Sequence, residues 1–202
     1  MPRIPLPGPE EMTPAQRRVH DAIISGPRGT LIGPLRAAIH NPELAERWSA
    51  LGEILRFRTS LPKRLSELAI LVTGRRWTSQ VEWWVHARAA ADAGLDAAII
   101  AAIREGAVPD FDDAKEALVY RFACALQQNG QVPRDIYDDA VRQFGVAGVV
   151  ELTALIGYYT MVSMTLNAHE IPLPEGVAAP LEAPGSGGLH VLPDIKEKSE
   201  GR

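Results

Sequence analysis

Three polar residues share one face of a predicted helix in the middle of this 202-residue sequence. Successive residues of an α-helix turn by about 100°, so Ser79, Glu82 and His86 fall within about 60° of arc. Glu82 precedes His86 by one helical turn, and a carboxylate in that position can fix the tautomer of the imidazole. General acid/base chemistry near neutral pH requires such a pair. The spacing therefore indicates a candidate proton-transfer site on this helix.

The same spacing also occurs in solvated surface pairs, which stabilise a helix by only about a few tenths of a kcal/mol. Two tryptophans, Trp83 and Trp84, lie beside the pair. Adjacent indoles indicate a helix that is enclosed on more than one side, which would place the pair in a pocket or an interface. We therefore expect a sheltered site, with Trp83 in its wall.

Helix-start and helix-stop residues divide the chain, and strict alternation of β-branched residues is scarce, so we predict an all-α fold. The helix that carries the polar face begins at Thr78 or Ser79 and ends at Gly94. A helix over 62–76 precedes it. The other expected helices run from Thr13 through Ile23, from Asn41 through Leu55, from Asp96 to Glu105, from Asp112 to about Gln128, from Pro133 to Phe144 and from Val146 to Leu166.

The chain divides into three predicted parts. Residues 1–33 form an N-terminal arm with one helix, residues 34–170 form the helical domain, and residues 171–202 form an extended C-terminal arm and flexible tail. Prolines and glycines recur in this last part, and no periodic apolar pattern survives there. We expect the arm to pack on its own or a neighbouring subunit, with a loose end after about Gly185.

Composition excludes several classes of function. There is one cysteine, Cys124, so an intramolecular disulfide or a dithiol reaction within one chain is impossible. A formal net charge of -4 and a pI near 5.8 argue against nucleic-acid binding. Residues 1–12 contain no apolar stretch of the length that a secretory signal requires, so we expect a cytoplasmic protein.

The segment Val146 to Leu166 is long enough to span a membrane. However, it contains Glu151, and neither flank has a cluster of Lys or Arg to anchor it. We therefore expect no membrane contact and interpret the segment as a helix buried inside an oligomer.

Two segments carry a family resemblance. Residues 64–71, Arg-Leu-Ser-Glu-Leu-Ala-Ile-Leu, and residues 82–88, Glu-Trp-Trp-Val-His-Ala-Arg, together resemble the core of the carboxymuconolactone decarboxylase family. The Ala-Gly-Leu at 93–95 resembles that family's helix ending. The main resemblance extends over about residues 61–145, with a looser match over 151–176. It implies a helical bundle like that of alkylhydroperoxidase D (AhpD) over residues 34–170.

The AhpD branch of this superfamily uses a glutamate, a Cys-x-x-Cys pair and a histidine four residues after the second cysteine. On this sequence these positions fall on Glu67, Ser79, Glu82 and His86, so both thiols are absent. Only a thiolate can reduce a peroxide and be regenerated by disulfide exchange, so we do not expect thiol-peroxidase activity. Cys124 lies outside the motif, and we expect it to be a small buried apolar residue.

The decarboxylase branch has a glutamate four residues before the histidine, as this chain has. The resemblance implies a homotrimer or homohexamer with pockets close to subunit contacts. It also implies that Glu67 faces Glu82 and His86, which makes these three residues the candidate catalytic set. Decarboxylation needs a donor that stabilises the enolate and an acid that protonates carbon. We hypothesise that His86 is that acid. The same acid/base residues would equally serve lactone hydrolysis, isomerisation and proton abstraction beside a carbonyl.

The expected substrate is a small carboxylic acid or lactone, bound by Trp83, Ser79, Arg75 and Arg76. The two arginines would meet its carboxylate, although arginines at a helix end also interact with the helix dipole. We expect no cofactor, because the sequence has no Gly-rich phosphate loop. We also expect no metal, because it has no His-x-x-x-His or Glu-x-x-His pair.

Two other functions stay open at this point. The first is an AhpD-like, peroxidase-related protein that reacts through Cys124, and thiol alkylation would abolish that activity. The second is a non-catalytic oligomeric binding protein in which Glu82 and His86 order an interface. An apolar patch together with a closed or absent pocket near His86 would favour the second function.

Overall fold

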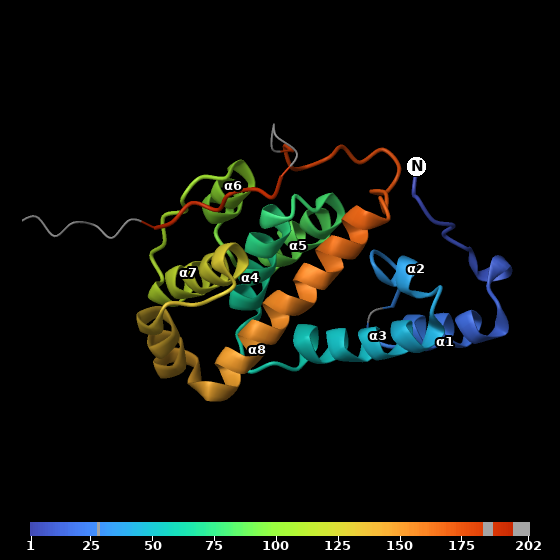
Figure 1. Ribbon diagram of the computed structural model, residues 1–202, viewed down its shortest axis with the longest axis horizontal. Helices are drawn as coiled ribbons and strands as arrows, with labels where there is room; N and C mark the ends of the chain where they lie inside the picture. Colours follow the sequence, from blue (N-terminus) through green and yellow to red (C-terminus); the bar gives the residue numbers. More distant parts are fainter. Residues whose placement is uncertain (28, 184–187, 196–202) are drawn as a thin grey trace, which may run out of the picture.

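The computed structural model describes residues 1–27, 29–183 and 188–195 (Figure 1). All regular structure in these residues is helical, which confirms the predicted all-α class. A short 3-10 turn, η1 (Pro9–Glu11), precedes the α-helices. These are α1 (Pro14–Ser25), α2 (Leu35–Ala38), α3 (Pro42–Phe57), α4 (Lys63–Arg76), α5 (Gln80–Asp92), α6 (Ala97–Glu105), α7 (Ala114–Asn129) and α8 (Arg134–Ala168).

Most helix ends lie where the capping residues predict them. Thr13 accepts a hydrogen bond from the backbone N–H of Gln16 at the start of α1, and Asn41 accepts one from Leu44 at the start of α3. Gly106, after α6, has a φ of 72°, a left-handed conformation that glycine adopts without strain. Local chemistry of the chain is therefore sufficient to set these boundaries.

The two helices predicted on either side of Gly145 form one kinked element, α8. Gly145 has φ 68° and ψ 172°. This region of backbone conformation is essentially restricted to glycine. The chain changes direction at Gly145 without a loop, and the apolar segment after the kink runs diagonally across the molecule (Figure 1).

Helix α4 lies at the centre of the fold. Every residue from Leu65 to Arg75 is buried, which is typical of a helix covered on all sides. It packs against α5, α7 and α8. In Figure 1, α4 to α7 lie on one side of the diagonal α8 and α1 to α3 lie on the other, so α8 joins the two groups. Residues from both groups can therefore meet beside α8.

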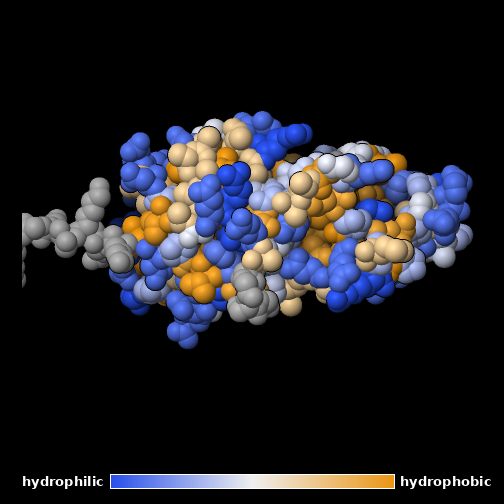
Figure 2. Space-filling view, turned by 90° about the horizontal axis from the view of Figure 1, so that it is seen from above, coloured by the Kyte–Doolittle hydropathy of each residue, from blue (hydrophilic) through white to orange (hydrophobic). Residues whose placement is uncertain are grey.

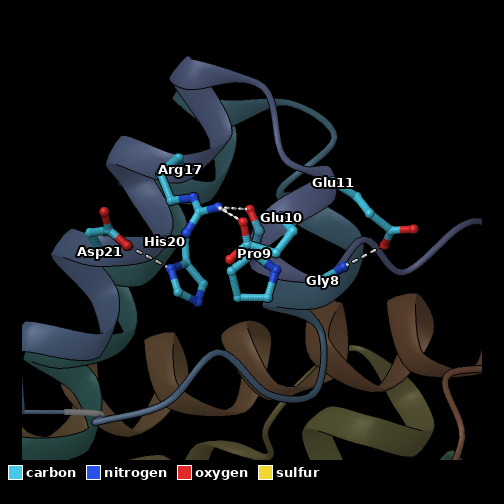
Figure 3. Close-up of polar contacts among 7 residues, drawn as sticks. All are labelled: Gly8, Pro9, Glu10, Glu11, Arg17, His20 and Asp21. Carbon is cyan, nitrogen blue, oxygen red and sulfur yellow. Dashed lines mark hydrogen bonds and ion pairs between the residues drawn. The ribbon is translucent and has the colours of Figure 1, made fainter.

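The predicted N-terminal arm is fixed to the rest of the chain. Figure 3 shows Arg17 of α1 reaching back to the turn η1, where it donates a hydrogen bond to the carbonyl of Pro9 and lies 3.7 Å from Glu10. The backbone N–H of Gly8 donates to Glu11 at 2.8 Å. Helix α1 in turn packs on α3. These contacts are exposed and structural.

The C-terminal arm returns across α5 and α6 after α8 (Figure 1). The backbone N–H of His190 donates to the carbonyl of Arg76 at 2.9 Å, and the Arg76 guanidinium donates to the carbonyl of His190 at 2.7 Å. Leu192 is buried, and its N–H donates to Gln128 of α7. The arm therefore packs on its own chain.

The sequence predicts a loose end after about Gly185, and the part of this segment that the structure describes differs from that prediction. Residues 184–187 and 196–202, on which part of the prediction falls, lie outside the described residues. The segment 189–195 between them is held by the contacts of the arm. Burial of the apolar side chain of Leu192 accounts for this difference.

Helix α8 is buried on one side and exposes apolar residues on the other. Val146, Val150 and Met164 are at least half exposed. Among the described residues α8 is the one helix that meets the length and hydropathy criteria for a membrane span, and 44% of its most apolar window is buried. Seen from above, apolar surface interrupts the charged surface of the molecule, notably right of centre (Figure 2).

Candidate active site

His86 lies between two carboxylates in the interior of the protein. Its Nδ1 is 2.6 Å from Oε2 of Glu67, and its Nε2 is 3.1 Å from Oε1 of Glu82. The side chains of His86, Glu67 and Glu82 are 4%, 2% and 5% exposed. The structure thus brings together the three residues predicted to be catalytic, and we name them the Glu-His-Glu cluster.

The packing of α4 against α5 creates this cluster. Glu67 points from α4 toward His86 on α5, while Glu82 reaches His86 along α5 itself. Gly74 of α4 lies against Glu82 of α5, where a Cβ would make ordinary van der Waals contact at 3.6 Å from Cγ of Glu82. The turn between the helices includes Thr78, whose φ is 48°. The three side chains meet because the two helices pack closely after a tight turn.

Tyr159 of α8 closes the cluster from a third direction. Its ring meets the His86 ring edge to face, with centroids 4.9 Å apart. Burial raises the pKa of Tyr159 well above its ordinary value, and the nearby carboxylate of Glu82 raises it further. The hydroxyl therefore stays protonated at neutral pH and can donate a hydrogen bond. In the sequence, the feature that could have pointed to Tyr159 is its phenol group within an otherwise apolar helix.

A cavity of about 50 Å³ opens beside His86 and Glu82. This volume is enough for a few water-sized groups. Its walls are mostly apolar, with a small number of polar groups, which is typical of small-molecule sites. Besides Glu82 and His86, the lining residues are Ile32, Gly33, Pro34, Leu35, Arg56, Val81, Val85, Tyr158, Tyr159 and Val162.

Trp83 and Ser79, predicted to bind substrate, do not line this cavity. Both are buried, Trp83 at 2% exposure and Ser79 at 0%. Val81 and Val85 lie on the cavity side of α5, whereas Trp83 is turned by about 100° from Glu82 in the opposite sense. Whether a side chain of α5 lines the cavity depends on which side of the helix faces it, and residue spacing alone does not reveal that side.

Arg75 and Arg76 are also absent from the cavity wall. Each donates a hydrogen bond to a backbone carbonyl of the C-terminal arm, Arg75 to Glu182 at 3.1 Å and Arg76 to His190 at 2.7 Å. They lie at the carboxyl end of α4, over which the arm passes. In this structure the two arginines bind the arm and do not line the cavity at His86.

Arg56 is a charged cavity residue that sequence reasoning missed. It lies in the last turn of α3, is half-buried, and its guanidinium stacks over the ring of Phe57 with 5.4 Å to the ring centroid. Helix α3 directly precedes α4 in the chain, and it packs against α1, α2 and α8. No spacing rule connects Arg56 with His86.

Cys124 is buried in α7 and lies outside the cavity wall. Burial raises the pKa of its thiol to about 12. A thiol with such a pKa is almost entirely protonated at neutral pH and is a poor nucleophile.

The Glu-His-Glu cluster leaves little room for a metal ion. Both ring nitrogens of His86 face a carboxylate oxygen, so neither is turned toward an open coordination position. Within the described ranges, no group of three or more His, Cys, Asp or Glu residues is arranged to hold a metal.

Comparison with known proteins finds a family match for part of the chain. Residues 42–124 match the model of the family described as carboxymuconolactone decarboxylase family. This segment begins with α3, ends in α7 and includes the Glu-His-Glu cluster. Among curated proteins, none matches this chain.

Solved structures show the fold. An uncharacterized peroxidase-related protein with an alkylhydroperoxidase AhpD core, from Ralstonia eutropha, is 13% identical with a TM-score of 0.69, covering 86% of this chain and 93% of that chain. An uncharacterized peroxidase-related protein from Silicibacter sp. is 14% identical with a TM-score of 0.66, covering 85% and 91%.

A variant of the debrominase Bmp8, solved in complex with 2,3,4-tribromopyrrole, is 17% identical with a TM-score of 0.63, covering 83% of this chain and 88% of that chain. The fold is therefore that of AhpD-like proteins. The resemblance predicted from the motif is confirmed: over residues 42–124 this chain carries the carboxymuconolactone decarboxylase family segment, on an AhpD-like fold.

Proposed function

We propose that this protein is a cofactor-independent, carboxymuconolactone decarboxylase-like enzyme that moves a proton on a small carboxylic acid or lactone. Decarboxylation or a related lyase or isomerase reaction is the proposed chemistry. One observation carries the proposal: a buried imidazole has a carboxylate oxygen within 3.1 Å of each ring nitrogen, at the edge of a cavity. An imidazole held in this way is suited to general acid/base catalysis.

The two glutamates would have different tasks. The short contact between Glu67 and Nδ1 of His86 suits a proton on Nδ1 that is donated to the carboxylate, which fixes the tautomer and the ring orientation. A second proton would then pass between Nε2 of His86 and Oε1 of Glu82, which lie 3.1 Å apart. Because Glu82 and His86 line the cavity and Glu67 does not, this shared proton is the one that a substrate can take.

For a β-keto or vinylogous acid the proposed step is decarboxylation. The bond between the substrate carbon and its carboxylate breaks, carbon dioxide leaves, and the electron pair remains as an enolate. Tyr159, neutral and in the cavity wall, can donate a hydrogen bond to the enolate oxygen. The carbon then takes the shared proton of Glu82 and His86, and solvent replaces it.

The structural neighbours support a compact substrate. One of them, the debrominase Bmp8, binds 2,3,4-tribromopyrrole, a small planar ring. The cavity of this chain is also small and mostly apolar. We infer a small planar or ring-shaped acid or lactone as the substrate class, handled without the thiol chemistry that the missing motif cysteines would supply.

Turnover of a substrate panel tests the proposal. Wild-type protein and a His86→Ala variant are incubated with small β-keto acids, vinylogous acids and lactones, and carbon dioxide release and product formation are followed. Ser66→Ala is a matched control, because Ser66 is a buried α4 residue next to Glu67 whose hydroxyl has no partner in the described structure. We expect at least one substrate to be consumed by wild type and Ser66→Ala and not by His86→Ala. Full turnover by His86→Ala would refute the proposal.

The redox alternative to proton transfer at His86 is a reaction at the thiol of Cys124. Since burial raises the pKa of this thiol to about 12, alkylation of the folded protein at pH 8 is expected to be slow and to become fast on unfolding. Activity that survives complete alkylation would eliminate the redox alternative, and activity lost in step with alkylation would support it.

A non-catalytic oligomeric protein is the second candidate function, and two observations favour it. The cavity is small, and α8 exposes an apolar stripe that includes Val146, Val150 and Met164. We propose that this stripe contacts further copies of the chain in a homotrimer or homohexamer, located in the cytoplasm. Light scattering of wild type and a Val150→Lys variant tests the assembly. Retained substrate turnover in the dissociated variant would separate assembly from catalysis.

A further inference from the structure

We propose that Arg56 binds the carboxylate of the substrate, so that the site prefers small acids to their neutral analogues. This inference rests on the proposed function, because it names the substrate class for the same cavity. It assigns to Arg56 the task that the sequence suggested for Arg75 and Arg76, which are committed to carbonyls of the C-terminal arm.

The position of Arg56 supports this assignment. Arg56 lines the cavity together with Glu82, His86 and Tyr159, while most other wall residues are apolar. Its side chain comes from the last turn of α3, so it approaches the cavity from the helix group opposite to α4 and α5. A ligand in the cavity would therefore lie between a cation and the proton-bearing pair of Glu82 and His86.

The guanidinium is available for a ligand. Among the described residues, no carboxylate oxygen lies within 4.0 Å of it, whereas Arg58, two residues further along, is paired with Glu53 at 2.7 Å. The guanidinium carbon of Arg56 lies 5.4 Å from the centroid of the Phe57 ring. A guanidinium edge matches the two oxygens of a carboxylate.

Charge balance gives the strongest reason for a cation here. Glu67 and Glu82 place two carboxylates around one imidazole, so an anionic substrate entering the cavity would meet net repulsion. Arg56 is close enough to the cluster for its charge to lower the pKa of Tyr159, against the larger effect of burial. A cation at this distance offsets the repulsion and orients the acid with its carboxylate toward α3 and its carbon toward His86.

Binding of matched acids and amides tests the assignment. The probes are benzoate with benzamide and crotonate with crotonamide, titrated calorimetrically into wild type, Arg56→Gln and Arg56→Lys. Arg58→Gln is the control for loss of a nearby positive charge. We expect Arg56→Gln to weaken binding of the acids by about tenfold or more and to change binding of the amides by less than about twofold. Arg56→Lys should retain part of the affinity, and thermal melting should verify that all variants are folded.

The outcomes separate this inference from the proposed function. Acid binding that is equal in wild type and Arg56→Gln, or an equal loss for acids and amides, overturns the assignment even where wild type turns the acids over. Selective weakening of the acids, with no turnover of any acid by wild type, supports Arg56 as the anion-binding residue and refutes the proposed catalysis. Wild-type protein that binds no acid at all overturns the assignment.

Discussion

Glu67 and Glu82 contact different nitrogens of one imidazole, and this difference separates their roles. Glu67 is the more buried and makes the shorter contact, at 2.6 Å, whereas Glu82 lines the cavity. In the proposed mechanism, Glu67 is therefore a positioning residue that acts through His86, and Glu82 shares the proton that leaves the pair. The proposed catalysis therefore depends on a negative charge, that of Glu67, which fixes the imidazole ring of His86.

Replacing Glu67 with glutamine tests the positioning role. An amide keeps a similar size and an acceptor oxygen but loses the negative charge that favours a proton on Nδ1. We expect kcat to fall by about a hundredfold or more, with KM within about twofold of wild type. Steady-state kinetics of Glu67→Gln, Glu67→Asp and the Ser66→Ala control measure this. An equal rise in KM, or a fall in kcat for Ser66→Ala as well, would point to a merely structural role.

The residues of the site were predictable to different degrees. Glu82 and His86 follow from helical spacing, because a side-chain pair one turn apart is a local property. Glu67 could be assigned only through the family motif. Arg56 and Tyr159 could not be predicted, since each lies on another helix than His86 and only tertiary packing brings them to the same cavity.

At the scale of helices, the kink of α8 determines where the second half of this helix lies in the bundle. Gly145 adopts a conformation that other residues rarely occupy, and α8 continues on both sides of it. The second half of α8 supplies Tyr158, Tyr159 and Val162 to the cavity. The direction that the chain takes at Gly145 therefore sets one wall of the site.

An alanine at Gly145 should destabilise the protein by about 1–3 kcal/mol, because the side chain is strained at this φ and ψ. Gly157→Ala is the matched control in the same helix: it is helical, and a Cβ there would meet no heavy atom within 4 Å. The control should leave the free energy of unfolding unchanged or raise it by up to about 1 kcal/mol. Urea denaturation compares the two variants, and equal effects would contradict a strained kink.

Helix boundaries were largely predictable because caps are local. Thr13 and Asn41 mark the starts of α1 and α3, and Gly106 marks the end of α6. The four-residue α2 was not predicted, because it is too short for apolar periodicity to develop. That omission matters, since Leu35 of α2 lines the cavity.

At the scale of the whole molecule, the C-terminal arm joins α4, α6 and α7. Tyr120 of α7 donates a hydrogen bond to the carbonyl of Pro193 at 2.9 Å. His190 lies against α6, where a Cβ on Gly106 would come within 2.5 Å of its Nε2. Sequence predicted an arm that packs, but its contacts come from several helices and had no local signal.

A Gly106→Ala variant should report on the docking of the arm. Its φ of 72° strains any side chain by about 1 kcal/mol, and the clash with His190 adds to this. Gly94→Ala, with φ 85° and no heavy atom within 4 Å of a Cβ, isolates the strain. We expect Gly106→Ala to unfold at lower denaturant than Gly94→Ala, and His190→Ala to remove part of the difference. If the effects of Gly106→Ala and His190→Ala on unfolding are purely additive, this result would contradict contact between His190 and Gly106.

His190 also predicts a pH dependence of stability. Burial lowers its pKa from the ordinary value of 6.5, and Arg75 and Arg76 lower it further. The unfolded chain then binds a proton at a higher pH than the folded chain, so stability is full above about pH 6.5 and declines as the pH falls below it. The difference in unfolding free energy between wild type and His190→Gln should shrink from pH 8 to pH 5. A difference that is constant across this range would exclude the effect.

The central claim is that His86, held by two carboxylates, transfers a proton to or from substrate carbon. Its most direct test is deuterium incorporation in D₂O, followed by proton NMR, at the acidic carbon of a small acid or lactone that the protein binds. We predict exchange by wild type that is at least about a hundredfold faster than by His86→Gln. Equal exchange rates in the two proteins would contradict the claim.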